Sequence, residues 1–317
     1  MRRREFFGTC AGAALGAAVA SPAATALPAV SPEPDASGPP FSLSVMLWTI
    51  YRDKPFDERL SKVAEAGYHA VELVGEFKDW TKDQFAAARK KKNELGIQFD
   101  ATAGIWHSIV DPATRDVYLK ALQDFLVPMQ ELECTRLILQ TGNKVPGLTQ
   151  EQMHANCIET LKRSIDLTEK ANIEILIENI DPEENPKYFL TSSAEGFDIV
   201  RTVAHPRVKF LYDFFHEQIS EGNLIVKLAK NIDLLGLVHV ADVPGRHEPG
   251  TGEIHYPNIL RKLAELGYNR YVAMEFLPLG DPVASLRAAR EMATKAGTVE
   301  RKQSSRTQNP RRPHAAA

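Results

Sequence analysis

One pattern constrains the fold of this chain more than any other. A short apolar run followed by a longer amphipathic stretch repeats eight times between residues 41 and 296. The runs begin about 30 residues or slightly more apart, which is the length of one strand–helix unit. Their residues are apolar in succession rather than in alternation, as in parallel strands covered by helices on both faces. The eight candidate strands are LSVMLW at residue 43, AVELV at 70, IQFDATA at 97, RLILQ at 136, IEILIEN at 173, VKFLYD at 208, LGLVHVAD at 235 and YVAMEF at 271.

The stretches between these runs carry signals for the start and end of helices. Thr81 and Thr149 each precede a segment with helical period, where a hydroxyl can cap the first turn. Gly96 and Asn172 stand just before the next strand, where helices end in a left-handed residue. Eight such units predict an α/β protein with one domain, a (β/α)8 TIM barrel over residues 41–297. The alternative is a doubly wound open sheet, which normally has a glycine-rich phosphate turn, and we find no such fingerprint.

The two ends of the chain do not continue the barrel pattern. Residues 1–26 begin with a cluster of arginines, continue with an Ala/Gly-rich apolar run and end in small residues suited to cleavage. This pattern resembles a twin-arginine export signal, so we expect an exported protein, periplasmic or extracellular, without a permanent membrane anchor. Residues 27–40 form a Pro-rich linker. Residues 298–317 are polar and patternless, which predicts a disordered tail.

Composition argues against several classes of partner and scaffold. The formal net charge is −3, from 38 basic and 41 acidic residues, whereas proteins that bind nucleic acid usually carry a positive balance. We therefore expect no nucleic-acid partner, and the sequence is compatible with a homo-oligomer. Of the 3 cysteines, Cys10 lies in the leader. Cys134 and Cys157 are predicted to be buried thiols rather than a bridge or a metal pair.

Polar residues interrupt the last four apolar runs near their C-terminal ends, where the active site of a (β/α)8 barrel lies. They are Glu178 in LIEN, Asp213 in LYDFFH, His239 in LVHVAD and Glu275 in AMEF. Taken singly, each has a structural interpretation as a helix cap, a salt-bridge partner or a core histidine. Together, three buried carboxylates would repel one another without a cation. The set predicts a site for one divalent metal ion, Mn²⁺ or Mg²⁺ first, with Co²⁺ or Zn²⁺ as alternatives.

Other residues fall near the expected mouth of the barrel, and the sequence does not choose between a pocket role and a structural role for them. They are Glu72, Trp106, His107, Gln140 and Glu184. Glu183 is as able as Glu184 to reach a substrate hydroxyl, so neither of the two is selected.

The segment after the seventh candidate strand, HVADVPGRHEPGTGEIHY, is the most specific in the chain. Together with LIEN, YDFFH and MEF, it resembles the xylose isomerase-like barrel superfamily, and within it the hydroxypyruvate isomerase and ketose 3-epimerase group. The resemblance covers about residues 43–295. It implies that one metal ion is held by Glu178, Asp213, His239 and Glu275.

The resemblance also implies roles in catalysis and substrate binding. Glu178 and Glu275 would double as proton-transfer groups. His216 and Arg246 would contact the substrate. For Arg246 the alternative is a surface ion pair with Glu248 or Glu253.

These residue types fit a reaction at the carbon next to a carbonyl group. An α-hydroxy carbonyl compound can bind a metal through two adjacent oxygens, which makes the neighbouring C–H more acidic. One glutamate would remove that proton to give a cis-enediolate, and protonation of the other carbon would complete an isomerisation. We expect a metal-dependent isomerase of a small hydroxy-carbonyl or sugar substrate, with hydroxypyruvate, converted to tartronate semialdehyde, as the first choice.

Four alternatives remain open. A ketose 3-epimerase would return the proton to the same carbon from the opposite face. A related sugar isomerase or dehydratase could use the same barrel. A non-catalytic exported carbohydrate-binding barrel would keep the pocket without the reaction. A phosphodiesterase that resembles the apurinic endonucleases would need a multi-metal cluster with more histidines.

Overall fold

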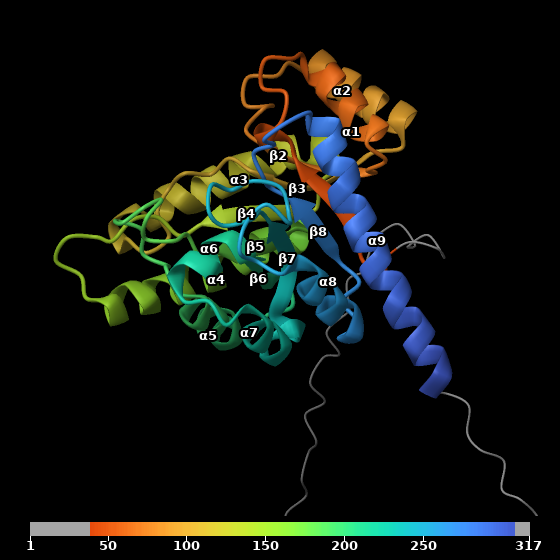
Figure 1. Cartoon of the computed structure of the whole chain (residues 1–317). Coiled ribbons are helices and arrows are strands. Elements are labelled where there is room, and N and C mark those ends of the chain that lie inside the picture. Colours follow the sequence, from red (N-terminus) through yellow and green to blue (C-terminus); the bar gives the residue numbers. More distant parts are fainter. Residues whose placement is uncertain (1–38, 308–317) are drawn as a thin grey trace, which may run out of the picture.

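This computed structural model describes residues 39–307 of the 317-residue chain, and the side chains of residues 39–296. Over these residues eight parallel strands pair in chain order and close into a ring, because the first strand also pairs with the last (Figure 1). The predicted (β/α)8 barrel is therefore confirmed. The strands are β1 Ser42–Met46, β2 Ala70–Val74, β3 Gln98–Ala103, β4 Arg136–Gln140, β5 Glu174–Glu178, β6 Val208–Asp213, β7 Leu235–Val240 and β8 Tyr271–Met274.

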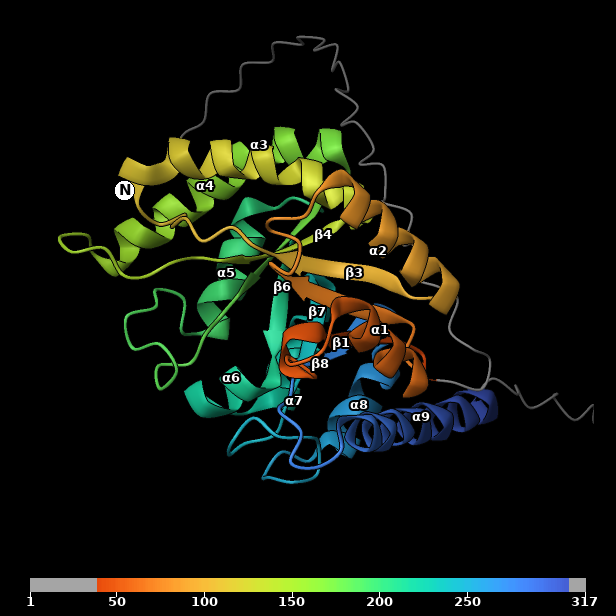
Figure 2. The ribbon, with the colours of Figure 1, turned by 90° about the horizontal axis from the view of Figure 1, so that it is seen from above.

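Helices surround the strands, as the view from above shows (Figure 2). The α-helices are α1 Phe56–Glu65, α2 Lys82–Leu95, α3 Arg115–Leu132, α4 Gln150–Ala171, α5 Ser193–Val203, α6 Phe214–Ser220, α7 Leu224–Lys230, α8 Tyr256–Glu265 and α9 Pro282–Thr307. Short 3-10 turns are η1 Leu47–Thr49, η2 Pro112–Thr114 and η3 Ile232–Leu234. No helix within the described residues is long and apolar enough to cross a membrane.

The predicted helix ends are confirmed by their local geometry. Thr81 and Thr149 each accept a hydrogen bond from the third residue of the following helix, and a glutamine at that position bonds back to the cap. Such caps satisfy backbone groups that a helix leaves open, at about 1 kcal/mol each. Gly96 and Asn172 have φ angles of 65° and 58°, the left-handed conformation that stops a helix.

The lumen of the barrel receives every second side chain of each strand. On β5, Leu176 belongs to the small apolar cluster of the lumen, and Glu178 follows two residues later. On β7, Leu237 and His239 repeat this order. Because strand side chains alternate between faces, the apolar residue forms the lumen core and the polar residue lies one layer nearer the mouth.

The register of the last strands places their polar residues on one rim. Asp213 of β6 and His239 of β7 are direct partners in the ladder. Just past the end of β8, the Glu275 N–H donates to the carbonyl of Val240 at 3.0 Å. Since neighbouring strands lie about 4.8 Å apart, side chains at equal height meet above the lumen core.

The end of the fold differs from the prediction. Helix α9 continues to Thr307, past the barrel boundary expected at residue 297. The disordered tail expected from residue 298 stays a prediction. The predicted signal segment 1–26, nearly all of the linker 27–40 and residues 308–317 lie outside the described residues.

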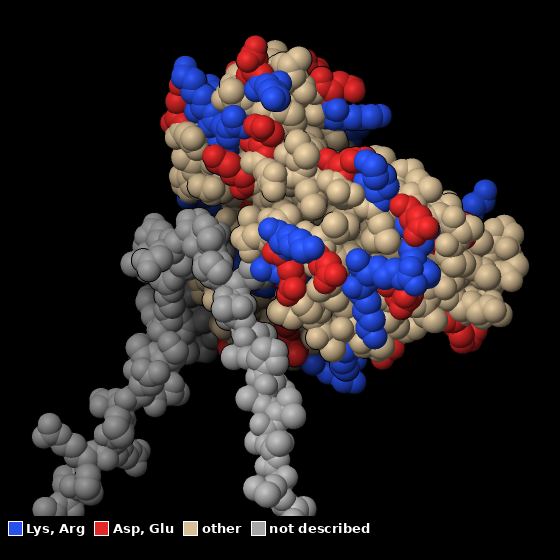
Figure 3. Space-filling model, turned by 180° about the vertical axis from the view of Figure 1, so that it is seen from behind, with Lys and Arg blue, Asp and Glu red and all other residues tan. Residues whose placement is uncertain are grey.

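The face seen from behind carries interspersed basic and acidic side chains (Figure 3). Exposed lysines pair with acidic residues one helical turn away, as Lys90 does with Glu94 and Lys120 with Asp124. Cys134 and Cys157 are buried free thiols, as predicted.

Candidate active site

Four side chains from strands β5 to β8 come together at the C-terminal end of the barrel. They are Glu178, Asp213, His239 and Glu275, the set that the sequence indicates. Each offers one ligand atom, and these atoms all lie within 4.8 Å of one another. The four residues are between 1% and 6% exposed, so water cannot screen their charges from one another.

The donor set fits a divalent cation. His239 Nδ1 lies 2.7 Å from Glu275 Oε2 and 3.6 Å from Glu178 Oε1. Within the described residues neither His239 Nδ1 nor Glu275 Oε2 makes a well-aligned hydrogen bond, although both atoms are buried. Buried polar atoms that lack a well-aligned hydrogen bond are rare, and these two lie 2.7 Å apart in the cluster. Three carboxylates and one imidazole are ligands that Mn²⁺, Mg²⁺ or Zn²⁺ accept.

The pKa shifts of these groups reflect several carboxylates buried close together. Burial raises the pKa of Glu178 to about 8. Burial acts in the same direction on Glu275, but Arg246 and His239 outweigh it and hold the pKa of this carboxyl below its ordinary value. For His239 burial opposes the charged form, yet the carboxylates of Glu72 and Glu275 raise its pKa well above the ordinary value. A bound cation would favour the ionised form of Glu178.

Glu72 of β2 lies behind His239, on the side away from the cluster. Its Oε2 is 3.0 Å from His239 Nε2, and the residue is fully buried. A carboxylate behind a metal-binding histidine fixes the orientation and tautomer of the ring. The sequence left Glu72 open between a pocket role and a structural one, and the structure places it as the partner of His239.

His216 lies beside the cluster, held by a carboxylate that the sequence did not single out. Asp181 Oδ2 is 2.7 Å from His216 Nδ1, while His216 Nε2 is 3.6 Å from Asp213 Oδ2. Burial opposes a charge on His216, but Asp213 and Asp181 outweigh it and raise the pKa of the ring to about 9. Asp181 Oδ1 also accepts from the backbone N–H groups of Glu183 and Glu184, so it joins His216 to the loop after β5.

Arg246 points into the same site rather than to the surface. Its Nη2 lies 2.8 Å from Glu275 Oε2 and 3.5 Å from Asp213 Oδ2, and its Nη1 lies 2.8 Å from Glu184 Oε2. The guanidinium also stacks on Phe215, 4.9 Å from the ring centre. The residue is 8% exposed, and the alternative ion pair with Glu248 or Glu253 is not what the structure shows.

A second unanticipated carboxylate, Asp242, shapes the loop that carries Arg246. Its Oδ2 accepts from the N–H groups of Gly250 and Gly252 at 2.8 and 2.9 Å, and its Oδ1 accepts from those of Val243 and Ile254 at 3.0 Å each. A Cβ at position 252 would lie 2.0 Å from the Val243 carbonyl oxygen, so only glycine fits there. The glycines of PGTG were the available signal, but their acceptor is visible only in the folded chain.

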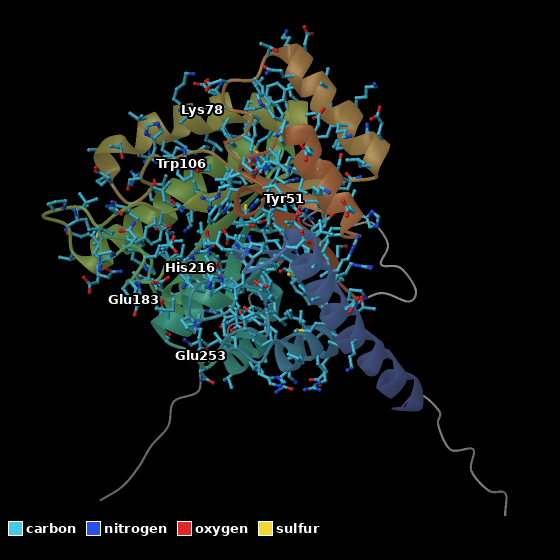
Figure 4. All side chains as sticks on the ribbon, turned by 45° about the horizontal axis from the view of Figure 1, so that its top comes forward. Tyr51, Lys78, Trp106, Glu183, His216 and Glu253 are labelled. Carbon is cyan, nitrogen blue, oxygen red and sulfur yellow. The ribbon has the colours of Figure 1, made fainter. Side chains whose placement is uncertain are left out.

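The cluster opens into a cavity of about 250 Å³. Its lining includes Glu178, Glu184, His216, His239, Arg246 and Glu275. Trp48 forms part of the wall and donates from Nε1 to Glu275 Oε1 at 3.1 Å, a residue that the sequence did not single out. Trp106 and Gln140 also line the cavity, while His107 is exposed and is not among its lining residues (Trp106 and His216 are labelled in Figure 4).

Known proteins are similar to this chain in architecture and in sequence. The family profile described as "Xylose isomerase-like TIM barrel" matches residues 60–295. A putative hydroxypyruvate isomerase from Danio rerio is 30% identical over 259 residues, 77% of this chain and 92% of the relative. A 2-oxo-tetronate isomerase from Haemophilus influenzae is 30% identical over 250 residues, 76% of this chain and 95% of the relative.

The solved structure of an AP endonuclease, family 2, from Brucella melitensis superposes with a TM-score of 0.69. It is 25% identical in sequence and covers 78% of this chain and 96% of its own. The fold, the family profile and these relatives agree. The chain therefore belongs to the xylose isomerase-like TIM barrel family, and it is an isomerase.

Proposed function

We propose that the protein is a metal-dependent isomerase of a small α-hydroxy carbonyl compound, with hydroxypyruvate, converted to tartronate semialdehyde, as the first substrate. The observation that carries this proposal is one small cavity in which Glu178 and Glu275 of the carboxylate cluster face Arg246, with Glu184 also in the lining. The relatives named hydroxypyruvate isomerase and 2-oxo-tetronate isomerase support the class of substrate.

The cation would be held by Glu178, Asp213, His239 and Glu275, and Mn²⁺ or Mg²⁺ suits this oxygen-rich set. When bound, it would polarise the substrate carbonyl as a Lewis acid. Glu72 would keep His239 turned toward the cluster from behind. Removal of the ion should leave the barrel folded, because the lumen core below the site is built from apolar side chains.

The protein side chains would bind the substrate and move its proton. Arg246 offers a planar fork that matches a carboxylate or two neighbouring oxygens. One glutamate accepts the proton from the carbon that bears the hydroxyl, and the electron pair enters an enediolate. A proton then returns to the former carbonyl carbon, and the hydroxyl proton passes to the former carbonyl oxygen, so atoms and charge balance.

The placement of the two glutamates also favours a second candidate, a ketose 3-epimerase. Glu178 ends β5 and Glu275 follows β8, and these strands are not neighbours in the ring. Carboxylates from separate parts of the rim could address opposite faces of one carbon. Protonation of that carbon from the second face would invert it rather than move the carbonyl group.

The test is proton exchange by metal-supplied protein in heavy water, with hydroxypyruvate and a set of ketoses as substrates. Isomerisation puts one deuterium on the former carbonyl carbon, and epimerisation puts it on the inverted carbon. Glu178→Gln and Glu275→Gln should each lower turnover by about 10²–10⁴-fold, and the double variant should lose less than the product of the two. Glu169→Gln, on the outer surface of α4, is the matched control.

Two results would overturn the proposal in different ways. Near-normal turnover by either single variant would place the base elsewhere. Sugar binding by metal-loaded protein without turnover or exchange would indicate a non-catalytic carbohydrate-binding barrel. We also propose that the protein is exported under the direction of residues 1–26, on the basis of their sequence pattern.

A further inference from the structure

A second cavity, of about 440 Å³, adjoins the first. The two cavities share Trp106, which follows β3, and Gln140, which ends β4. The first cavity, at about 250 Å³, is smaller than the about 300–1,000 Å³ typical of pockets that enclose drug-sized ligands. The space next to the proposed reaction site is thus larger than the site itself.

The walls of the second cavity are tied together by backbone hydrogen bonds. The loop after β4 and the loop after β5 form a short antiparallel bridge at Asn143 and Tyr188. The Lys144 N–H donates to the Lys187 carbonyl at 2.7 Å, and the Phe189 N–H donates to the Gly142 carbonyl at 3.0 Å. The cavity is therefore a built feature of these loops rather than a gap between them.

The same loop serves both cavities with consecutive residues. Glu184 lines the first cavity, and Asn185 lines the second. Tyr188 lines the second cavity, and its hydroxyl donates to the carbonyl of Glu178 at 3.3 Å and accepts from the Thr141 N–H at 2.7 Å. A ligand could therefore extend from the carboxylate cluster into the second cavity along one wall.

The chemistry of the second lining suits a neutral polyhydroxy ligand. Asn143, Asn185 and Ser108 offer amide and hydroxyl groups, which pair with sugar hydroxyls in either direction. The charged members are one cation, Lys144, and one anion, Asp111, so the lining favours neither net charge. An anionic ligand such as a phosphate would call for several cations or a run of N–H groups.

Trp106 stands at the junction of the two cavities and is 63% exposed. Aromatic side chains are common in the linings of ligand pockets. The flat apolar face of this indole matches the C–H face of a pyranose ring, while the ring hydroxyls remain free for the amides around it.

We propose that the second cavity is a binding site for a neutral sugar ring, so that the preferred substrate is an α-hydroxy carbonyl sugar that carries a glycosyl unit. The carbonyl end reacts at the cluster of the first cavity, and the glycosyl ring lies on Trp106 and faces Asn143 and Asn185, whose side chains are joined by a hydrogen bond of 3.0 Å. This deepens the proposed function and rests on it for the placement of the reacting end. Hydroxypyruvate would then be turned over as a minimal substrate that fills the first cavity alone.

The experiment compares fructose with glycosyl-fructoses, namely isomaltulose, turanose and lactulose, by calorimetric titration of the Mn²⁺-supplied protein. At least one disaccharide should bind about tenfold or more tightly than fructose. Trp106→Ala should weaken disaccharide binding by a larger factor than fructose binding, because Trp106 lines both cavities, and Trp106→Phe should restore part of the loss. Val127→Ala, at a similarly exposed position on α3, is the control and should change nothing. Metal content should be the same in all variants.

Three outcomes would overturn the proposal. The first is that no disaccharide binds more tightly than fructose. The second is that Trp106→Ala weakens fructose and disaccharides equally, which would assign Trp106 to the first cavity. The third is that fructose 6-phosphate outcompetes every disaccharide and loses this advantage in Lys144→Ala, which would make the site anionic. Disaccharide preference without turnover or deuterium exchange would support the second site and count against the isomerase, so the two proposals fail separately.

Discussion

The carboxylate of Asp242 holds the loop of residues 243–254 in shape, and a substitution that changes one of its atoms tests this role. Each of its two oxygens accepts hydrogen bonds from two backbone N–H groups of this loop, and the residue is fully buried. Asp242→Asn replaces one oxygen by an NH₂ group that cannot accept. Whichever way the amide turns, two N–H groups of the loop then face a donor instead of an acceptor.

The magnitude follows from the kind of bond that is lost. A hydrogen bond to a charged group contributes about 1.5–3 kcal/mol, so the loss of two costs about 3 kcal/mol at the lower end. The loop lies at the mouth, outside the apolar core, so the cost should appear as local opening rather than as unfolding of the barrel. A change of about 3 kcal/mol corresponds to about a hundredfold change in the opening equilibrium. Arg246 is carried by this loop, and its hold on the substrate should weaken with it.

The assay is hydrogen exchange of the backbone amides of Gly250, Gly252 and Ile254, which are the donors to Asp242 and so report directly on the loop. We expect exchange about a hundredfold faster in Asp242→Asn, a kcat/KM lowered by at least about tenfold, and metal content unchanged. Asp79→Asn, at an exposed position, is the matched control. Unchanged exchange at these amides in Asp242→Asn would refute the reasoning, because it would show that the loop holds its shape without the carboxylate.

Further predictions concern the metal, the substrate, pH and export. Glu72→Gln should weaken metal binding by about 10–100-fold with the fold intact, measured by competition with a chelator, and equal affinity would count against its role behind the ligand histidine. Arg246→Lys keeps the charge but loses the fork, so kcat/KM should fall by at least about tenfold with metal content unchanged; full activity of Arg246→Ala would contradict the substrate role. Burial raises the pKa of Asp100 from 3.8 to about 8, so the folded state keeps a proton that the unfolded state releases. The free energy of unfolding should therefore fall between about pH 4 and pH 8, by up to about 1.4 kcal/mol per pH unit, and denaturant titrations should show a flatter profile for Asp100→Asn; an identical slope would exclude this group. Changing Arg3 and Arg4 to lysine should keep the protein in the cytoplasm of its host, and unchanged export through a twin-arginine route would refute the signal assignment.

The strands were the most predictable part of this fold. The apolar runs at residues 70, 136 and 208 coincide with β2, β4 and β6. A strand that is buried on both faces is apolar over its full length, so the run marks both of its ends. The runs at 235 and 271 overshoot β7 and β8 by two residues each. After β7 the chain is still buried, but Asp242 already bonds to the loop that follows it. Hydrophobicity alone does not mark the point at which ladder pairing ends.

The site was predictable where its residues interrupt apolar strands, since a charged group in such a place has few structural explanations. The sequence did not single out Trp48 and Asp181 as site residues, because each contacts a partner far away in the sequence. Trp48, in η1, contacts Glu275 across the closing seam of the barrel, and Asp181, in the loop after β5, contacts His216 of α6. These contacts depend on distances between separate elements, which no local pattern encodes.

The closure of the ring by β1 and β8 has a consequence for folding during synthesis on the ribosome. Ser42 pairs with Tyr271, so β1, the first strand to be synthesised, can pair with β8 only after the last strand has left the ribosome. Until then β1 and β7 present unpaired edges, and the seam joins segments of high sequence separation, which folds slowly. The cluster residues come from β5 to β8 and are likewise synthesised late. The last strand to be translated thus completes the sheet, and Glu275 directly after it completes the cluster, so a nascent chain that stops before β8 has neither.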